Sequence, residues 1–260
     1  MARPLVLLSN DDGHRAPGIR LLKQAMQAWA DVVICAPDSE QSTTSHSLSL
    51  NRPLRLSEVS EDVYAVDGTP ADCVYVALHG ERILTRKPSL VVSGLNHGLN
   101  LGTDVFYSGT VAAAREAALK GFTSLAVSAD VSADFERASL AASRLAHALL
   151  EAAEPPCLFN VNFPKQGSWL PRATSLGRRY YQDEVEFRRD PRGREYLWIG
   201  GASVTHDLVR GSDTEAHDRG EVGITPLMLD LWDDRGVPAA QRVVDALGQA
   251  KDANRGIESL

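Results

Sequence analysis

Cysteine, positive charge and long apolar runs are all scarce in this sequence, and each absence excludes a class of protein. Its 260 residues contain three cysteines, Cys35, Cys73 and Cys157, which lie far apart among apolar neighbours. No two of them have the spacing of a zinc site or a redox motif. We therefore expect buried free thiols, no sulfur-bound metal and a reducing compartment.

The charge balance is acidic, with a formal net charge of −7. A protein that holds a nucleic-acid backbone needs a concentrated positive surface, so we expect no polynucleotide partner. Small anions are compatible with this charge, because a metal ion and backbone amides can bind phosphate locally on an acidic protein.

The first apolar run covers only Leu5–Leu8, which is too short for a signal sequence or a membrane span. We expect a cytoplasmic protein with no membrane partner. The length, with 43% hydrophobic and 23% charged residues, favours one main core. We expect a single domain over 1–260, with a core sheet over 1–164, a hairpin excursion and return strand over 165–235, and a C-terminal helix and tail over 236–260.

Strand and helix patterns alternate along the first part of the chain. Short apolar runs that end at turn residues predict strands at 5–8, 32–36, 63–66, 90–92, 125–127 and 158–161. Helical spacing and strong helix formers predict helices at 21–29, 70–78, 111–120 and 135–151. This alternation is typical of an α/β fold, and we predict a Rossmann-like, doubly wound, mostly parallel sheet in three α/β/α layers.

The pattern changes in the C-terminal third of the chain. Residues Glu184–Arg189 and Glu195–Ile199 alternate like strands on either side of the turn Asp190–Gly193, which predicts a protruding β-hairpin. Beyond the hairpin we expect a strand at Val222–Thr225 and a helix at Val237–Leu247.

Oxygen-bearing side chains follow three of the predicted strands. Asp11 and Asp12 come directly after the first strand. Ser42 lies in the loop after the second strand, and Asn96 follows the fourth. Because ligands bind beyond the carboxyl ends of strands in open parallel sheets, we expect these side chains to share one site.

Two adjacent carboxylates repel each other unless a cation, a shared proton or a basic partner compensates. The carboxylate, hydroxyl and amide oxygens of this set suit a hard divalent ion, and Mg²⁺, Mn²⁺ and Ca²⁺ all fit. The turn Asn10–Gly13 alone would be an ordinary surface turn, since its residue types are common turn formers. The prediction of a metal site therefore depends on the whole set.

Ser108, Gly109 and Thr110 begin an alanine-rich predicted helix. Free backbone amides, two hydroxyls and the positive end of the helix dipole would suit a phosphate there. A simple helix N-cap explains the same residues without any ligand. Asn100 also has two interpretations, as a turn residue or as a phosphate contact.

A metal beside an anion-binding helix end meets the needs of phosphomonoester hydrolysis. Asp11 or Asp12 could orient the attacking water, and the sequence does not choose between them. His14, His46 and His97 lie near these residues as candidate proton donors to the leaving group, or as exposed loop residues.

The sequence resembles the SurE family, survival proteins that act as 5'-nucleotidases, along most of its length. The matching segments are Ser9–Gly13 with Ala16–Gly18, Ala36–Asp38 with Ser42, Ser45 and Ser47–Ser49, Gly68–Val74, Val92–Asn100, Tyr107–Ala114, Asp190–Gly193, Gly211–Asp213, Gly220 and Ile224–Leu227.

The resemblance implies a metal-dependent 5'-nucleotidase that acts on nucleoside monophosphates, with activity toward 3'-nucleotides and short polyphosphate as an extension. It implies one divalent cation per subunit, Mg²⁺ or Mn²⁺ before Ca²⁺. Its implied residues are Asp11 and Asp12 for catalysis, Asp11, Asp12, Ser42 and Asn96 for the metal, and Asn100, Ser108, Gly109 and Thr110 for the phosphate. It also implies a homodimer or homotetramer, with the hairpin and an exchanged C-terminal extension used in oligomerisation.

Two positions depart from the family pattern. Arg15 stands where the family often carries His, Tyr or an acidic residue, and Thr43 stands where Gly is frequent. These changes bear on substrate preference rather than on the ligand set.

Two other functions are open to this fold class. A dinucleotide-dependent oxidoreductase would need a Gly-x-Gly-x-x-Gly turn after the first strand, and Asn10–Gly18 has none. A non-catalytic metal-dependent binding module would retain the ligands without turnover.

Overall fold

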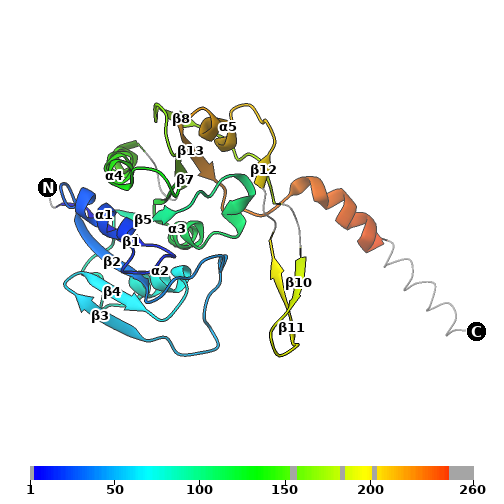
Figure 1. Ribbon diagram of the computed structural model, residues 1–260. Coiled ribbons are helices and arrows are strands. Elements are labelled where there is room, and N and C mark those ends of the chain that lie inside the picture. Colours follow the sequence, from blue (N-terminus) through cyan, green and yellow to red (C-terminus); the bar gives the residue numbers. More distant parts are fainter. Residues whose placement is uncertain (1–2, 153–156, 182–184, 201–203, 246–260) are drawn as a thin grey trace, which may run out of the picture. The chain divides into compact units, whose positions relative to one another are not determined.

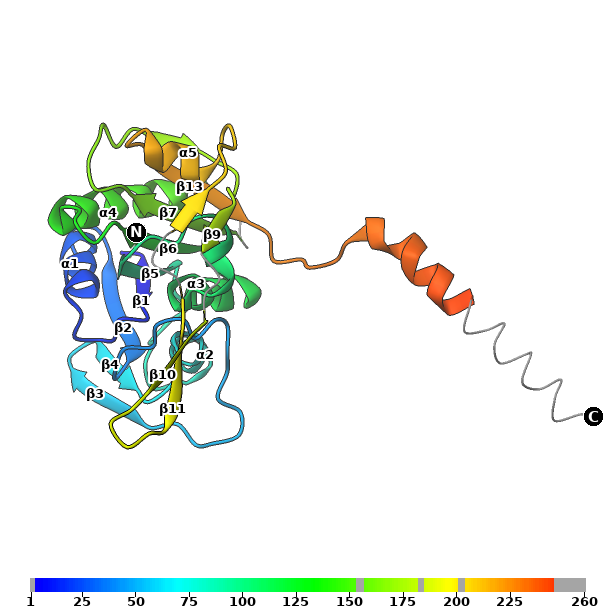
Figure 2. The ribbon, with the colours of Figure 1, turned by 45° about the vertical axis from the view of Figure 1, so that its right-hand side comes forward.

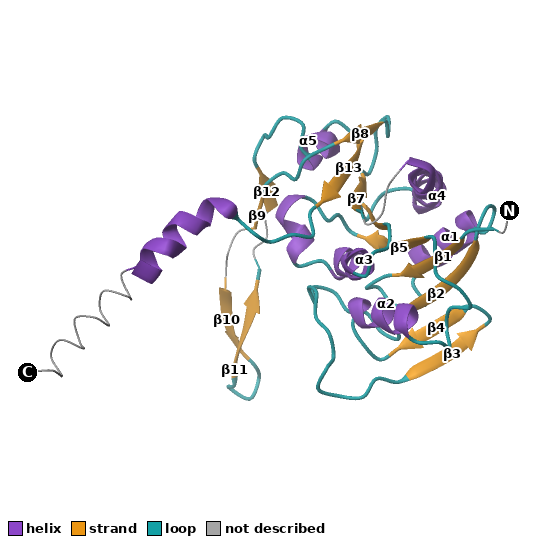
Figure 3. Ribbon diagram, turned by 180° about the vertical axis from the view of Figure 1, so that it is seen from behind, coloured by secondary structure: helices purple, strands orange, loops and turns teal. Residues whose placement is uncertain are grey.

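The computed structural model describes residues 3–152, 157–181, 185–200 and 204–245. Nine strands form one sheet: β1 (Leu5–Ser9), β2 (Asp31–Pro37), β3 (Leu56–Ser60), β4 (Val63–Val66), β5 (Leu90–His97), β6 (Ser124–Ala129), β7 (Leu158–Phe163), β8 (Pro171–Ala173) and β13 (Val222–Leu227). Their order is β3-β4-β2-β1-β5-β6-β7-β13-β8. Figure 3 shows this sheet from behind. Strands β4, β2, β1, β5, β6 and β7 run parallel, so the predicted doubly wound sheet is confirmed.

Helices cover both faces of the sheet (Figure 1). Helices α1 (Pro17–Met26) and α4 (Phe135–Ala152) pack on one face, and α2 (Pro70–His79) and α3 (Gly109–Leu119) pack on the other. In β1, Val6 and Leu8 join the core under α1 and α4, while Leu5 and Leu7 join the core under α2 and α3. This two-sided burial explains why the strand is continuously apolar.

Local sequence sets the starts of the two helices nearest the site. Thr69 accepts a hydrogen bond from the backbone of Asp72, whose carboxylate accepts one from the backbone of Thr69, so α2 begins with a capping box. Ser108 caps α3 through its hydroxyl oxygen, which accepts from the Val111 backbone at 3.1 Å. Because α2 follows β4 and α3 follows β5 in the chain, both capped helix starts lie toward the carboxyl edge of the sheet.

The C-terminal third contains more structure than the sequence predicts. The predicted hairpin is present as β10 (Val185–Arg189) and β11 (Glu195–Ile199), which pair antiparallel and cross in the view of Figure 2, with Glu184 outside the described residues. The predicted strand at 222–225 is β13, which pairs antiparallel with β7. The sequence did not predict β8, β9 (Arg179–Tyr181), β12 (Val204–His206), the 3-10 helix η1 (Gly102–Phe106) or α5 (Asp213–Asp218).

Two boundaries and one further strand, β3, also differ from the prediction. Strand β5 continues to His97 through a register shift between Ser93 and Asn96, so the segment expected to end the strand lies inside it. Helix α1 ends at Met26, which leaves Trp29 beyond it. Strand β3, a mostly exposed edge strand, lacks the apolar signal that revealed the buried strands.

The chain divides into two compact units, Met1–Leu227 and Met228–Leu260. In the second, the 3-10 helix η2 (Asp234–Gly236) leads into a helix over 237–245, and the predicted end at Leu247 lies outside the described residues. None of the helices that the structure describes combines the length and apolar character needed to span a bilayer. Cys35 and Cys73 are buried free thiols as predicted, whereas Cys157 is half-buried.

Candidate active site

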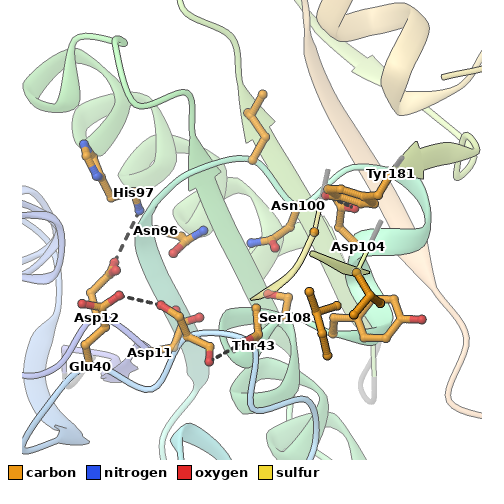
Figure 4. Close-up of a pocket in the computed structure, with 16 residues that line it drawn as sticks. Asp11, Asp12, Glu40, Thr43, Asn96, His97, Asn100, Asp104, Ser108 and Tyr181 are labelled. Carbon is orange, nitrogen blue, oxygen red and sulfur yellow. Dashed lines mark hydrogen bonds between the residues drawn. The ribbon is translucent and has the colours of Figure 1, made fainter. Parts of the chain in front are cut away.

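A cavity of about 900 Å³ lies at the carboxyl edge of the sheet and gathers most of the predicted site residues. Six of them line it: Asp11, Asp12, Ser42, Asn96, Asn100 and Ser108. Figure 4 shows five of these, all but Ser42, labelled around the cavity. The side chains come from loops after β1 and β2, from the end of β5 and from the start of α3, as the strand-end argument predicts.

Asp11 is the most buried of the predicted metal ligands, at 6% exposed. Thr110 donates its hydroxyl to Asp11 Oδ1, and a Cβ added at Gly109 would lie 2.8 Å from Asp11 Cβ. Thr110 and Gly109 do not line the cavity. Both lie behind it, against Asp11. Only a residue without a side chain fits at Gly109 with Asp11 in this position.

Burial raises the pKa of Asp11 to about 6, and the neighbouring charge of Asp12 adds to the rise. Burial also raises the pKa of Asp12, whose Oδ2 accepts a hydrogen bond from the His97 backbone at 3.4 Å. No basic side chain lies within ion-pair distance of either carboxylate among the described residues. A bound cation would favour the ionised form of both groups.

Ser42 and Asn96 add neutral oxygens to this pair. Asn96 donates its amide to the Gly98 carbonyl at 2.8 Å, which leaves its side-chain oxygen for a ligand. The exposed Ser42 donates its hydroxyl to Glu40 at 2.7 Å, so its oxygen lone pairs can still bind a cation. The loop is held to the acidic turn where the Gln41 backbone donates to the Asp11 carbonyl at 2.8 Å.

The donor chemistry fits a hard divalent ion. Two carboxylates, one amide oxygen and one hydroxyl oxygen line the same cavity, and such ions prefer oxygen ligands. Among the described residues there is no group of three or more His, Cys, Asp or Glu side chains that could hold a metal, so a metal at Asp11 and Asp12 would need the neutral oxygens of Ser42 and Asn96 as well. With only two carboxylates, the set leaves coordination positions for water and substrate.

The two departures from the family pattern lie in different places. Thr43 lines the cavity and has a φ of +57°, in the left-handed region that is unfavourable for a β-branched residue. Arg15 lines a separate cavity of about 350 Å³ beside α1. Of the two, Thr43 is the one that borders the site.

Asn100 is anchored by a buried amide network that the sequence analysis missed. Its backbone N–H donates to Asn162 Oδ1 at 2.8 Å, and its carbonyl accepts from the amides of Asn160 and Asn162. Its own amide donates to the Ser128 hydroxyl at 2.8 Å. Two asparagines spaced two apart on the buried strand β7 were the available signal, because both point to one face of the sheet.

The three histidines near the motifs have different surroundings. His97 lines the cavity. His46 Nε2 lies 2.8 Å from Glu116 Oε2 on α3. His14 is buried, with Nδ1 3.3 Å from the Pro37 carbonyl, so the expectation of an exposed loop residue is wrong for it.

The wall of the cavity beside Asn100 contains side chains that the sequence analysis did not select. Asp104 is buried and accepts a hydrogen bond from the Tyr181 hydroxyl at 2.6 Å and another from Arg179. Burial and the bond to Asp104 raise the pKa of Tyr181 to about 12, so its phenol stays neutral and donates. No local pattern reveals this contact, since Tyr181 lies 77 residues from Asp104.

Comparisons with known proteins agree with this architecture. A model of the family described as "Survival protein SurE" matches residues 6–183. The protein named 5'-nucleotidase SurE from Sorangium cellulosum is 61% identical over 236 residues, covering 88% of this chain and 92% of that protein. Another of that name, from an Anaeromyxobacter species, is 49% identical over 230 residues, covering 86% and 90%. The crystal structure of SurE from Aquifex aeolicus superposes with a TM-score of 0.79 at 35% identity, covering 92% of this chain and 99% of that one.

Proposed function

The chain belongs to the SurE family, and from that membership we propose that it is a metal-dependent 5'-nucleotidase that hydrolyses nucleoside 5'-monophosphates to nucleoside and phosphate. The observation that carries this proposal is a single cavity in which two carboxylates, a hydroxyl and an amide lie beside the N-terminus of α3. The relatives named 5'-nucleotidase SurE support the substrate class.

We assign Asp11, Asp12, Ser42 and Asn96 to one divalent cation, Mg²⁺ or Mn²⁺ before Ca²⁺. When bound, such an ion supplies Lewis-acid stabilisation of the negative charge that develops on the phosphoryl group. The same ion would keep both carboxylates ionised against the effect of their burial.

The phosphate is assigned to Asn100, Ser108, Gly109 and Thr110, of which Asn100 and Ser108 line the cavity. Ser108 lines the cavity at the first turn of α3, where free backbone N–H groups and the helix dipole favour an anion. Asn100 contributes its side-chain amide, which Ser128 orients, and Asn162 holds the Asn100 backbone in place. The Thr110 hydroxyl donates to Asp11, so Thr110 acts on the site by holding Asp11 in position.

Proton transfer is assigned to the carboxylates of the acidic turn and to one nearby histidine. Asp11 or Asp12 orients the attacking water and accepts its proton. The leaving nucleoside oxygen needs a proton donor, and His97 is the histidine of the three candidates that lines the cavity.

The experiment is hydrolysis of a nucleotide panel and a chromogenic phosphomonoester with Mg²⁺ or Mn²⁺, then with a chelator. Asp11→Asn and Asp12→Asn are compared with Glu58→Gln, an exposed carboxylate on β3. We expect loss of activity with chelator and in both Asp variants, and normal activity in Glu58→Gln. Metal-independent hydrolysis, or full activity in both Asp variants, would refute the mechanism. Nucleotide binding without turnover by the wild type would favour a binding module instead.

The proposals on secondary substrates and on location in the cell also depend on membership of the SurE family. We propose that 3'-nucleotides and short polyphosphate are secondary substrates, which the same panel measures. We place the protein in the cytoplasm, where its three free thiols would stay reduced.

We propose that the protein is a homodimer or homotetramer in which the hairpin and the C-terminal segment contact a second copy. On one face of the hairpin, Val185 pairs with Ile199 and Phe187 pairs with Leu197, and all four side chains are exposed. An exposed apolar strand pair of this kind is stabilised when a partner covers it.

A further inference from the structure

The cavity extends well beyond the residues assigned to metal and phosphate. Its volume of about 900 Å³ also takes in Asp104, Tyr107 and Tyr181, with Val185 and Ile199 at its edge. A metal ion and a phosphate group occupy only part of such a volume. Besides Asp104, whose carboxylate is already hydrogen-bonded, this part is lined by two tyrosines and by the aliphatic side chains of Leu99, Val185 and Ile199, which form a surface for an apolar or aromatic group.

Tyr181 is the aromatic side chain held most firmly in this wall. Its hydroxyl donates to Asp104 Oδ1 at 2.6 Å. Asp104 is itself fixed, because its other oxygen accepts from Arg179 and from the Leu101 backbone at 3.3 Å. Tyr181 is 45% exposed and lines the same cavity as Asn100, and Figure 4 labels both residues. A ring whose polar end is already satisfied loses little conformational freedom when it stacks on a ligand.

Tyr107 is a weaker candidate in the same wall. Its side chain is 64% exposed, and no hydrogen bond to another described residue holds its ring. We therefore take Tyr181 as the stacking surface.

We propose that Tyr181 stacks on the base of the nucleotide and so makes the enzyme select nucleotides over simple sugar phosphates. This inference rests on the proposed function. Its physical basis is that Asn100 and Ser108 line the same cavity as Tyr181. A nucleoside whose phosphate is bound at Asn100 and Ser108 therefore shares this cavity with the Tyr181 ring. Stacking on an aromatic side chain is tolerant of base identity, because every base has a π-face.

A second cavity of about 410 Å³ offers the base another place. It is lined by Pro17, Leu95, His97 and Phe135 next to Asp12. The rings of His97 and Phe135 lie against each other, with centroids 5.2 Å apart. Neither Asn100 nor Ser108 lines this second cavity, so it lacks the phosphate contacts that the first one has.

The test compares kcat/KM for adenosine 5'-monophosphate and for ribose 5-phosphate, which lacks the base. We expect Tyr181→Leu to lower the value for the nucleotide about tenfold or more and to leave the value for the sugar phosphate unchanged. Tyr181→Phe keeps the ring and should retain most of the preference. Phe135→Leu, the matched control in the other cavity, should leave the ratio unchanged.

The proposal is overturned if Tyr181→Leu lowers both values equally, if it changes neither, or if Phe135→Leu removes the preference instead. Calorimetric binding of adenosine separates this proposal from the proposed function. Weaker adenosine binding in Tyr181→Leu supports stacking even if the chain hydrolyses no nucleotide. Equal binding by wild type and Tyr181→Leu refutes stacking even if the wild type is an active nucleotidase.

Discussion

His46 ties the loop that carries Ser42 to helix α3, and replacing it tests how the metal site is held in place. His46 Nε2 lies 2.8 Å from Oε2 of Glu116, and Glu116 is only 3% exposed. Lys120 Nζ lies 3.3 Å from the other carboxylate oxygen. The contact therefore joins the loop presenting Ser42 to the helix whose first turn presents Ser108.

The size of the effect follows from the burial of Glu116. A hydrogen bond to a buried charged group contributes about 1.5–3 kcal/mol, so His46→Ala should lower the free energy of unfolding by about 2 kcal/mol. Glu116→Gln should cost less, because an amide can still bond to His46. In the double variant the two losses should be non-additive by about 1 kcal/mol, since the residues are in direct contact.

The same change should weaken metal binding. Side chains that orient metal ligands typically affect affinity by about tenfold or more when removed. We expect Mn²⁺ to bind His46→Ala about tenfold more weakly by calorimetry, and saturating metal to restore most of kcat.

The assays are urea unfolding followed by circular dichroism and Mn²⁺ titration. Lys87→Ala, at an exposed position just before β5, is the control and should stay within about 0.5 kcal/mol of wild type. If His46→Ala unfolds like this control and binds Mn²⁺ as tightly as wild type, the reasoning is wrong.

The pH dependence gives a further check on Glu116. Burial alone would raise the pKa of Glu116, but hydrogen bonds from His46 and Lys120 outweigh it and hold the pKa below its ordinary value. A lowered folded pKa contributes stability that is present above the unfolded pKa of about 4.3 and is lost as the pH falls through the folded value. The stability difference between wild type and Glu116→Gln should therefore shrink below about pH 4 and hold steady above about pH 6. A difference that grows in acid would contradict the assignment.

Three other changes have defined outcomes. Gly109→Ala puts a methyl group 2.8 Å from Asp11 Cβ, so kcat/KM should fall about 100-fold while the circular dichroism spectrum is retained; near-normal activity would show that Asp11 can move freely. Asn162→Ala removes two hydrogen bonds to the Asn100 backbone and should raise the inhibition constant of inorganic phosphate about tenfold; an unchanged constant would remove Asn100 from the phosphate site. Phe187→Glu places a charge on the apolar hairpin face, so light scattering should give a smaller molecular mass for the assembly. An unchanged mass would show that the hairpin does not contact a second copy.

The core of the fold could be predicted because its signals are local. Buried parallel strands show as short apolar runs, and the helices between them show as apolar residues at helical spacing. The edge strand β3 and the short strands β8, β9 and β12 have mixed, largely exposed residues and no such signal. The continuation of β5 to His97 was missed because Ser93 and Gly94 resemble a turn in sequence, although a register shift carries the strand through them.

The candidate site could be predicted to the extent that the topology of a parallel sheet brings strand ends together. This rule alone selected Asp11, Asp12, Ser42 and Asn96, and the cavity contains all four. The rule did not show that Thr110 bonds to Asp11, which lies 99 residues away.

The sequence by itself determined the fold class and the metal and phosphate candidates, because apolar periodicity and turn residues act over a few neighbouring positions. Only the tertiary structure decided what holds those candidates and what faces them. His46 meets Glu116 across 70 residues, Asn100 meets Asn162 across 62, and Asp104 meets Tyr181 across 77. Contacts of that range leave no local pattern, since they depend on how whole elements pack and not on the residues beside them in the chain.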